Sequence, residues 1–468
     1  MNASRKRRAC LILAWFAATP AAAFEMEMGA VTLNDTFTVP SWTSVTFLDP
    51  FDAPPLVFAL PTNDGSDPST IRIRNVTSTG FELLQVEPSA NDGPHVAMPT
   101  AYLAIERGDH LLPDGSRLLA FEYSTTSFVN RFLSTTWDTR TFPSAFSATP
   151  AVIAGIQTMN NESGTPPSTT SSPFMDVGIR NVTTGSLQVT LERAESTAGT
   201  VSSPERIGLL VADSGFSLTF VDRFGNSIDL QSLATPTNIQ GWDNGCFVNP
   251  YPSAFASPPL AVASANTRNG NNGGWVRRCS ISSSTLGLTF DEDIDNDSER
   301  NHIGESAGII AASRGFHANF AVELGVVKDV ATISDPINMG TDPKAIPSAI
   351  VNFTLSVENV GSLSPDSDSL TVVESVPDEL SLCVTSACLA AGPVVLDATG
   401  SPVPPGVTIG AIEYSDDGGA TWGYSPSPDA DGFDGSVDAV RITLSGTLSS
   451  MSTSGPPSFD LVFAARVN

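Results

Sequence analysis

Four aspartates alternate along the most acidic segment of the chain, at Asp291, Asp293, Asp295 and Asp297. Alternate side chains of an extended segment point to the same side, and carboxylate oxygens are the ligands that Ca²⁺ prefers. These four residues are therefore candidate ligands of a hard cation such as Ca²⁺. The alternative is a solvated hairpin tip, because an EF-hand loop requires Gly and Glu where this segment has Asn296 and His302.

Residues suited to catalysis are sparse. No phosphate-binding loop occurs in the sequence. The histidines belong to no recognisable nucleophile or metal pattern; they are His95, His110, His302 and His317. The segment 415–422 has the spacing of an Asp-box, in which Ser and Asp side chains hold a hairpin turn. We therefore expect no enzymatic activity and no cofactor other than the cation considered above.

The N-terminus has the three parts of a secretory signal peptide. A basic start at 5–8 precedes a short apolar core at 10–18, and three alanines at 21–23 form a cleavage site. We expect residues 1–23 to be removed and the remainder to be secreted or placed at the cell envelope. The apolar core is shorter than the ~18–20 residues that a membrane span needs, so no membrane insertion is expected.

The composition limits the partners of the chain. The formal net charge is −27, with 23 Lys and Arg against 50 Asp and Glu. Such a charge argues against nucleic acids and anionic membrane surfaces as partners. Apolar residues make up 41% of the chain, which is enough to bury a core.

Outside the signal peptide the cysteines form two local pairs, Cys246 with Cys279 and Cys383 with Cys388. In an exported protein, even pairs of cysteines within one domain indicate disulfide bonds. Metal ligation is the alternative, although no histidine lies at ligand spacing from either pair.

The elements that must position these residues are repeated. An aromatic residue, a short turn with Pro and an apolar run begin at Phe51, Phe146 and Phe255, which lie 95 and 109 residues apart. This spacing is the length of a small domain and exceeds the ~20–50 residues of a solenoid unit. Alternating strands around Asn/Thr/Gly turns follow the first two openings, and the third copy is degraded in this stretch. We therefore expect three tandem domains at 24–129, 130–225 and 226–326.

The sequence changes character after Val327. Strand-length segments bounded by Gly, Pro, Asn and Ser continue to the end, and helical periodicity is hard to find anywhere. Residues 327–468 are expected to form one immunoglobulin-like β-sandwich. The fold class expected for the whole chain is all-β, with three tandem antiparallel β-sandwiches followed by this fourth one.

The first repeat resembles the H-type lectin domain. The resemblance rests on Val45, Phe47, Phe51, Pro54, Pro55 and Val57 at the opening, on Arg72, Arg74 and the turn from Asn75 to Phe81, and on the closing Tyr102, Ala104 and Gly108. It implies a six-stranded antiparallel β-sandwich that is often trimeric and binds N-acetylgalactosamine-type sugars in clefts between protomers. Three tandem copies would imitate that trimer within one chain.

Within the first repeat, Arg72, Arg74 and Tyr102 are the candidate carbohydrate-binding residues. Arginine forks donate to sugar hydroxyls or to an acetamide oxygen, and a tyrosine ring stacks on the apolar face of a sugar. The other repeats have Leu209 and Ile309 at the position of Tyr102, so the site is expected in the first repeat. The alternative is that the arginines form a solvated strand face and that Tyr102 belongs to the core.

The C-terminal segment resembles the conserved repeat domain of bacterial surface proteins, at 347–361, 414–422 and 438–443. Those domains are immunoglobulin-like spacers, and the resemblance implies a cell-surface setting. Together the two resemblances lead to the hypothesis of a secreted or surface-exposed protein that binds cell-surface glycans through lectin-like modules. The alternative is a structural spacer or assembly component of a surface structure that binds no sugar.

Overall fold

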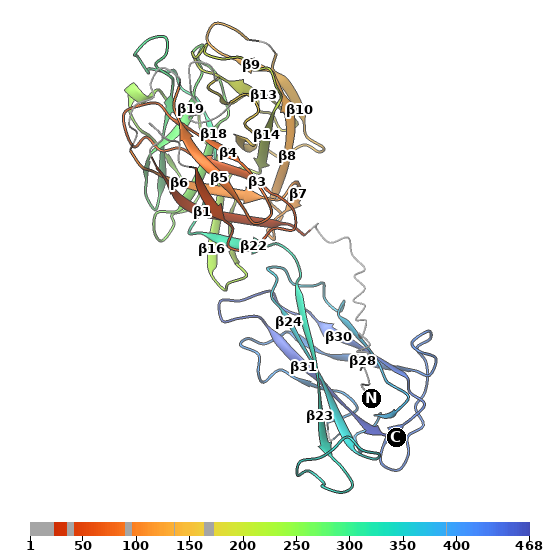
Figure 1. Ribbon diagram of the computed structural model, residues 1–468. Coiled ribbons are helices and arrows are strands. Elements are labelled where there is room, and N and C mark those ends of the chain that lie inside the picture. Colours follow the sequence, from red (N-terminus) through yellow and green to blue (C-terminus); the bar gives the residue numbers. More distant parts are fainter. Residues whose placement is uncertain (1–22, 35–41, 89–95, 135, 163–172, 390) are drawn as a thin grey trace, which may run out of the picture. The chain divides into compact units, whose positions relative to one another are not determined.

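The computed structural model describes residues 23–34, 42–88, 96–134, 136–162, 173–389 and 391–468. The expected signal peptide lies outside this part, except for Ala23. The described residues form β-strands and one short 3₁₀-helix without any α-helix, which confirms the all-β class. No helix among them is long and apolar enough to cross a membrane. Two compact units are present (Figure 1), Ala21–Phe320 and Ala321–Asn468, called here the N-terminal and C-terminal units.

Three sets of strands in the N-terminal unit correspond to the three sequence repeats. The first set is β1 (Glu25–Leu33), β2 (Thr43–Thr46), β3 (Leu56–Leu60), β4 (Thr70–Arg74), β5 (Gly80–Val86) and β6 (Met98–Ile105). The second set is β8 (Arg117–Thr125), β9 (Phe128–Val129), β10 (Asp138–Thr141), β11 (Ala151–Ile156), β12 (Asp176–Arg180), β13 (Ser186–Glu192) and β14 (Glu205–Ala212). The third set is β16 (Ser227–Ala234), η1 (Trp242–Asn244), β17 (Phe247–Pro250), β18 (Leu260–Ala265), β19 (Trp275–Ile281), β20 (Thr285–Asp291) and β21 (Ala307–Ala312). One further strand follows each set, namely β7 (Gly108–Leu111), β15 (Ser217–Val221) and β22 (Phe316–Asn319).

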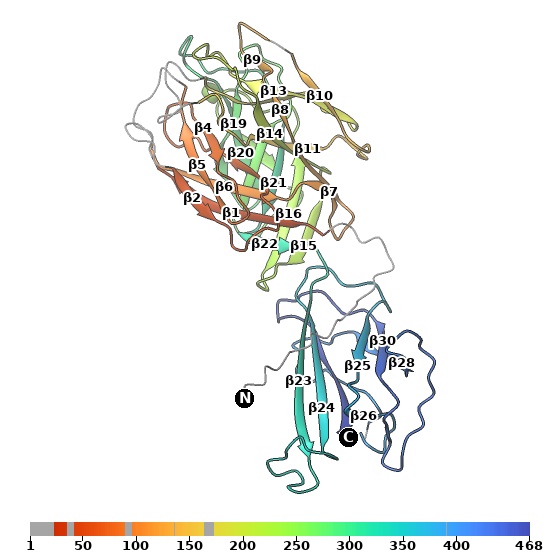
Figure 2. The same cartoon turned by 45° about the vertical axis from the view of Figure 1, so that its right-hand side comes forward.

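The last strand of the unit closes the three repeats into a ring. The four-stranded sheets have the equivalent orders β22-β1-β6-β3, β7-β8-β14-β11 and β15-β16-β21-β18. In the second and third sheets the first strand comes from the end of the preceding repeat. In the first sheet β22 from the end of the third repeat takes this place (Figure 2), with Met28 opposite Phe316. The ring therefore forms within one chain.

Each repeat also has a sheet of three antiparallel strands, in the orders β2-β5-β4, β10-β13-β12 and β17-β20-β19, and in the second repeat β9 extends it by pairing with β13 in parallel. It packs on the four-stranded sheet of the same repeat around a buried apolar cluster. The opening aromatics Phe51, Phe146 and Phe255 belong to these clusters, and the backbone N–H of each donates at 2.8 Å to a turn residue of its three-stranded sheet. The repeated sequence opening thus joins the two layers of each repeat.

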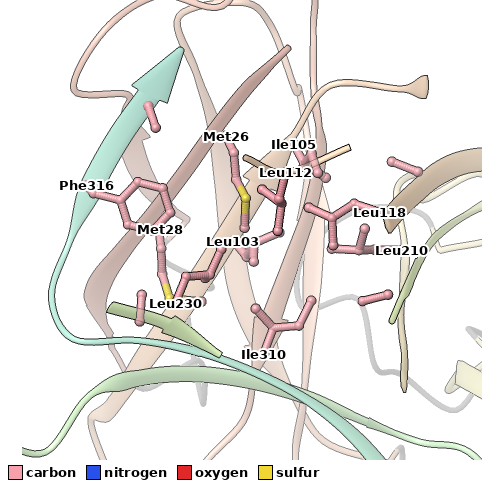
Figure 3. Close-up of a cluster of buried hydrophobic side chains, with 14 of the residues drawn as sticks. Met26, Met28, Leu103, Ile105, Leu112, Leu118, Leu210, Leu230, Ile310 and Phe316 are labelled. Atoms are coloured by element: carbon pink, nitrogen blue, oxygen red, sulfur yellow. The ribbon is translucent and has the colours of Figure 1, made fainter. Parts of the chain in front are cut away.

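The opposite faces of the four-stranded sheets meet in one central cluster (Figure 3). Leu103, Leu210 and Ile310 occupy equivalent positions in β6, β14 and β21 and are completely buried there. Burial of one such side chain contributes about 1.5–3 kcal/mol. Each repeat thus has one apolar cluster between its own two sheets and shares this central cluster with the other two repeats.

Side-chain amides join neighbouring repeats at two of the three interfaces. Gln157, directly after β11, donates to the carbonyl of Val57 at 2.8 Å and accepts from its N–H at 3.0 Å. Asn266, directly after β18, makes the same two bonds to Val152 at 2.8 and 3.0 Å. Both residues lie eleven positions after the opening aromatic of their repeat.

At the equivalent place of the third interface a backbone N–H takes part in place of the side-chain amide, although Arg277 Nε nearby also donates to the Thr62 carbonyl at 2.9 Å. Thr62 stands at the equivalent position of the first repeat, and its hydroxyl donates to Asp64. The N–H of Arg278 in the third repeat donates to the carbonyl of Pro61 at 2.8 Å. The ring is therefore threefold in outline but not in detail.

The limits between repeats that follow from strand pairing differ from the ranges expected from the sequence. β8 lies within 24–129 but pairs with β14 of the second repeat. β15 lies within 130–225 but pairs with β16 of the third. A strand of the C-terminal unit, β23 (Leu324–Ser334), spans the expected limit between 326 and 327. The second repeat therefore begins with β8, before residue 130, whereas β7 and β15 are strands that one repeat contributes to the sheet of the next.

The C-terminal unit has two sheets around one buried cluster. The larger sheet has the order β23, β24 (Ile350–Asn359), β31 (Ser458–Val467), β26 (Leu380–Cys383) and β29 (Phe433–Asp434), and β27 (Val395–Asp397) also pairs with β31. The smaller sheet has the order β25 (Thr371–Ser375), β30 (Ala439–Gly446) and β28 (Val407–Ser415). In β30 the alternating residues Val440, Ile442 and Leu444 are buried, as period-two patterning requires.

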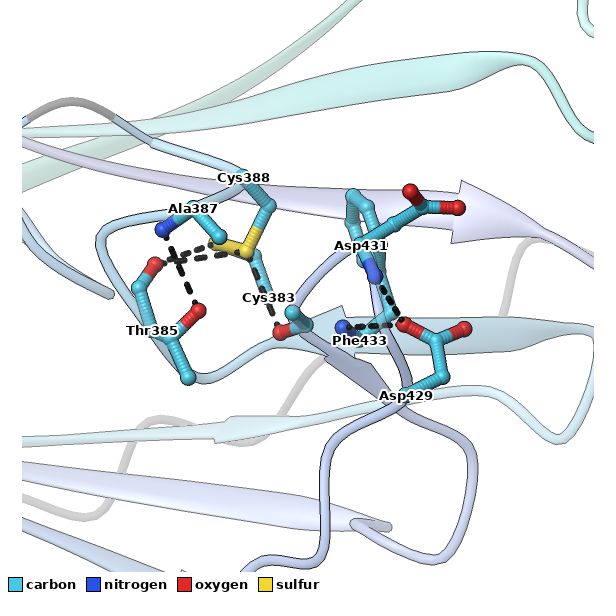
Figure 4. The surroundings of a disulfide bond; sticks show 8 residues. Cys383, Thr385, Ala387, Cys388, Asp429, Asp431 and Phe433 are labelled. Carbon is cyan, nitrogen blue, oxygen red and sulfur yellow. Dashed lines mark hydrogen bonds between the residues drawn. A yellow bond between two sulfur atoms is a disulfide. The ribbon is translucent and has the colours of Figure 1, made fainter.

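Cys383 and Cys388 lie at disulfide distance beside Phe433 in this unit (Figure 4), with sulfur atoms 2.08 Å apart. In the same view Asp429 accepts the backbone N–H groups of Asp431 and Phe433 at 3.0 and 3.1 Å and so shapes the neighbouring turn.

The Asp-box-like segment is a turn held by its own side chains. Ser415 Oγ donates to Asp417 at 2.8 Å and accepts the N–H of Gly419 at 2.9 Å.

Candidate functional site

Tyr102, expected to stack on a sugar, lies in the core. It is 5% exposed, and its hydroxyl donates to Glu27 Oε1 at 2.7 Å. Burial and the Glu27 carboxylate raise the pKa of Tyr102, so the hydroxyl remains a donor. The ring packs edge-on against Phe81, with 5.1 Å between centroids. This placement leaves no open face for a sugar and corresponds to the alternative considered from the sequence.

Arg72 is also enclosed, because a loop of the second repeat covers it. It is 1% exposed and forms an ion pair of 2.5 Å with Glu162. Burial opposes its charge, but the Glu162 carboxylate raises the pKa of Arg72 overall. Arg72 therefore connects two repeats and does not face solvent.

The alternating aspartates are directed to different partners. Asp291 is buried and accepts from Arg277 at 2.6 Å. Asp293 accepts the backbone N–H of Glu195, in the second repeat, at 2.6 Å. Each of these two carboxylates is thus satisfied inside the protein.

The remaining two aspartates do not complete a cation site. The backbone N–H of Asp295 donates to Asp293 at 3.0 Å, and Asp297 pairs with Arg131 at 3.1 Å. Nowhere in the described part of the chain are three or more His, Cys, Asp or Glu side chains arranged to hold a metal ion. The expected convergence on Ca²⁺ does not occur, because arginines and backbone amides occupy the carboxylates.

Arg74, the third sugar-binding candidate, belongs to a cluster at the surface. Its guanidinium carbon lies 3.7 Å from the ring centroid of Trp42, and its Nε donates to Glu82 at 2.8 Å. Asn75 donates to the same oxygen of Glu82 at 2.7 Å. We call Trp42, Arg74, Asn75 and Glu82 cluster 1.

The second repeat builds the same arrangement. Arg180 lies over the ring of Trp137 at 4.2 Å, and its Nε donates to Gln188 at 2.9 Å. Asn181 donates to the same oxygen of Gln188 at 2.9 Å. We call Trp137, Arg180, Asn181 and Gln188 cluster 2.

Strand register and turn chemistry explain both clusters. Arg74 lies directly opposite Glu82 on neighbouring strands, and Arg180 lies opposite Gln188. Each arginine ends its strand, and the next residue has a φ of 52°. Asparagine tolerates this left-handed conformation better than most residues, and here its amide also reaches the cross-strand partner.

The clusters hold an arginine fork in a fixed orientation. An aromatic face lies against one side of each guanidinium, and Nε is bonded, so the side chain loses little entropy when a ligand binds. The terminal nitrogens of Arg74 and Arg180 have no hydrogen-bond partner among the described residues, and 37% of the Arg74 side chain is exposed. Such a fork donates to two neighbouring oxygens of a ligand.

Both clusters lie near the margins between repeats. Arg72, two residues before Arg74 on β4, binds Glu162 of the second repeat. Near cluster 2, Arg268 of the third repeat binds Glu192 of the second at 2.6 Å.

The third repeat has a disulfide where the others have a cluster. Cys246 and Cys279 are joined, with sulfur atoms 2.00 Å apart. Gly287 occupies the position of Glu82 and Gln188, and a Cβ there would lie 2.6 Å from Cys246 Sγ. Arg300 does lie over Trp242, at 4.1 Å, but it is buried.

Two hollows of the unit are poor alternatives for a sugar. A cavity of about 40 Å³ is lined by all three repeats, which leaves room for little more than one water molecule. A depression of about 340 Å³ between the first and third repeats has no aromatic residue in its lining and so offers no stacking surface.

Buried acids gather where the second and third repeats meet. Burial raises the pKa of Glu192 to about 6, that of Asp293 to about 7 and that of Glu292 to about 8. Glu292 Oε1 lies 3.7 Å from His302 Nε2, and neither atom has a hydrogen-bond partner among the residues that the structure describes. Burial lowers the pKa of His302.

Sequence reasoning missed the tryptophans and the cross-strand partners of the arginines. Trp42 and Trp137 lie 95 residues apart, the same spacing as Phe51 and Phe146. This equal spacing was a signal in the sequence that the two tryptophans occupy equivalent positions of the first two repeats.

Comparison of the chain with family models, with curated proteins and with solved structures finds no match.

Proposed function

We propose that this chain is an exported, non-catalytic protein that binds glycans through clusters 1 and 2. The observation that carries the proposal is the recurrence of one arrangement, an arginine clamped between a tryptophan and a polar cross-strand partner, at equivalent surface positions of two repeats. A fixed fork of donors beside an aromatic residue suits the vicinal hydroxyls of a sugar. Two such sites in one chain favour adhesion, because linked sites raise the avidity for a surface.

Two further features support the proposal. The closed ring of three repeats is the trimer-like arrangement that a resemblance to H-type lectins implies. The two disulfide bonds are typical of proteins that work outside the cytoplasm.

The test is a glycan array probed with the full exported chain and with three variants, Arg74→Ala, Arg180→Ala and the double variant. Each arginine supplies hydrogen bonds worth about 1–3 kcal/mol, so each single variant is expected to weaken one site by about 5- to 150-fold and the double variant to abolish binding.

The matched control is Arg441→Ala in the C-terminal unit. Arg441 also lies over a tryptophan, Trp422, at 4.7 Å, and bonds to Glu413 at 2.7 Å. It belongs to neither cluster, so the control is expected to bind like the parent. An array without any bound glycan, or a folded double variant that binds like the parent, contradicts the proposal and leaves the structural spacer as the better account.

A further inference from the structure

Clusters 1 and 2 differ in one charged residue. Arg74 forms an ion pair with Glu82 at 2.8 Å. Arg180 instead donates to the neutral amide oxygen of Gln188 at 2.9 Å. The other members of the two clusters are the same residue types, so cluster 1 is formally neutral and cluster 2 carries one positive charge.

No carboxylate of the described residues compensates Arg180. The nearby Glu192 bonds to Arg268 at 2.6 Å and accepts the N–H of Ala194 at 2.9 Å. Burial and the neighbouring Arg268 lower the pKa of Arg180, and no acid acts in the opposite direction. In a chain of net charge −27, an uncompensated arginine beside a second one is a local site for an anion.

The geometry of cluster 2 selects the kind of anion. The guanidinium is held by Trp137 on its face and by Gln188 at Nε, which leaves the terminal nitrogens as donors. Two parallel N–H groups match the two oxygens of a planar carboxylate. We propose that cluster 2 binds the carboxylate of a hexuronate-type sugar, whereas cluster 1 binds a neutral sugar. This inference rests on the proposed function and adds the substrate class of each site.

The test uses two probes that differ only at C6, methyl β-D-glucuronide and methyl β-D-glucoside. Their binding to the full chain is measured by calorimetry and ligand-observed NMR at low ionic strength. Arg74→Ala disables cluster 1 and leaves cluster 2 as the remaining site. In this variant the glucuronide is expected to bind at least tenfold more tightly than the glucoside.

Two isosteric variants exchange the charge between the clusters. Gln188→Glu places the carboxylate of cluster 1 beneath Arg180 and is expected to remove the preference. Glu82→Gln frees Arg74 and is expected to add a second glucuronide site. Both positions are partly exposed, and an unchanged melting temperature shows that each variant is folded.

Several results overturn the inference. One is an Arg74→Ala variant that binds both probes equally, prefers the glucoside or binds neither. Another is an Arg74→Ala variant that keeps its preference for the glucuronide after Gln188→Glu is added and the protein still folds. If the array shows neutral glycans bound and lost in Arg74→Ala, the proposed function survives such a result and only the assignment of the acidic sugar fails. An array without any bound glycan removes both.

Discussion

Gln157 makes both hydrogen bonds of a strand pairing with Val57, although the two residues belong to different repeats. Its amide donates to the Val57 carbonyl at 2.8 Å and accepts from the Val57 N–H at 3.0 Å. A glutamine side chain thereby replaces a missing strand neighbour. Both residues are buried, so water does not substitute for either bond.

Gln157→Leu keeps the size of the side chain and leaves two buried backbone groups of Val57 without partners. Each unsatisfied group costs about 1–3 kcal/mol, so we expect the N-terminal unit to lose about 2–5 kcal/mol of stability. Urea unfolding of the full chain, followed by tryptophan fluorescence, measures the loss. Thr62→Val is the matched control, because it leaves the backbone bonds of Arg278 at that interface intact. The hydroxyl that it removes donates to Asp64, which is exposed and can bond to water instead, so the expected cost is under about 1 kcal/mol. Equal losses in both variants contradict the role of Gln157.

The repeats were predictable because their signals are local. The opening aromatics and the Arg-Asn-Val-Thr turns lie within short stretches of chain, and both are used as expected in the first two repeats. The ring closure was not predictable, because β22 pairs with a strand almost the whole unit away in sequence. No local pattern in Phe316–Asn319 indicates that partner.

The candidate site was predictable only where local signals determine it. Arg72 and Arg74 lie two positions apart on β4 and share a face of the strand, so the sequence of the first repeat alone predicts the same role for both. Glu162 from the second repeat encloses Arg72 and leaves Arg74 at the surface. Only the packing between repeats separates the two roles. The partner Glu82, by contrast, follows from hairpin register alone.

The two disulfides are expected to stabilise their units unequally. Cys246 and Cys279 are separated by 33 positions, and Cys383 and Cys388 by 5. Loop-closure entropy then predicts losses of about 4 and about 2 kcal/mol when each pair is replaced by serine. Chemical unfolding of the two double variants measures these losses. A larger loss for the shorter loop contradicts the entropic account, and free thiols at these positions in exported protein contradict the bonds themselves.

The buried acids predict that the N-terminal unit loses stability as pH rises. The pKa values of Asp293 and Glu292 are raised by burial to about 7 and about 8, so the folded state retains protons that the unfolded chain releases near pH 4. Their contribution is therefore fully present below pH 4 and is lost as pH rises through 7 and 8. Calorimetry is expected to show a lower melting temperature at pH 9 than at pH 6.5.

The variant Glu292→Gln isolates this effect. Burial lowers the pKa of His302 below its ordinary value of 6.5, so this residue changes its charge mainly below the chosen pH range. Burial lowers the pKa of His317, but the neighbouring carboxylates outweigh burial and raise the pKa overall. The stability that His317 contributes is therefore also lost as pH rises, as it is for the acids. Glu292→Gln leaves His317 untouched, so a smaller pH-dependent drop in this variant assigns the difference to Glu292. A drop equal to that of the parent contradicts the assignment.

Tyr102→Phe separates the core role of this residue from a role in sugar binding. Among the described residues the hydroxyl of Tyr102 is one of three donors to the buried carboxylate of Glu27, together with the N–H of Leu48 at 2.8 Å and the imidazole of His317 at 3.0 Å. Hydrogen bonds to charged groups are worth about 1.5–3 kcal/mol, so we expect the variant to lose about 2 kcal/mol of stability and to bind glycans like the parent. Tyr251→Phe is the control, because the buried hydroxyl of Tyr251 has no partner in the described part of the chain, and its removal is expected to cost nothing. Unfolding curves and the glycan array give the two readouts. A folded Tyr102→Phe variant that keeps the stability of the parent but no longer binds glycans contradicts the core role and assigns Tyr102 to the sugar site.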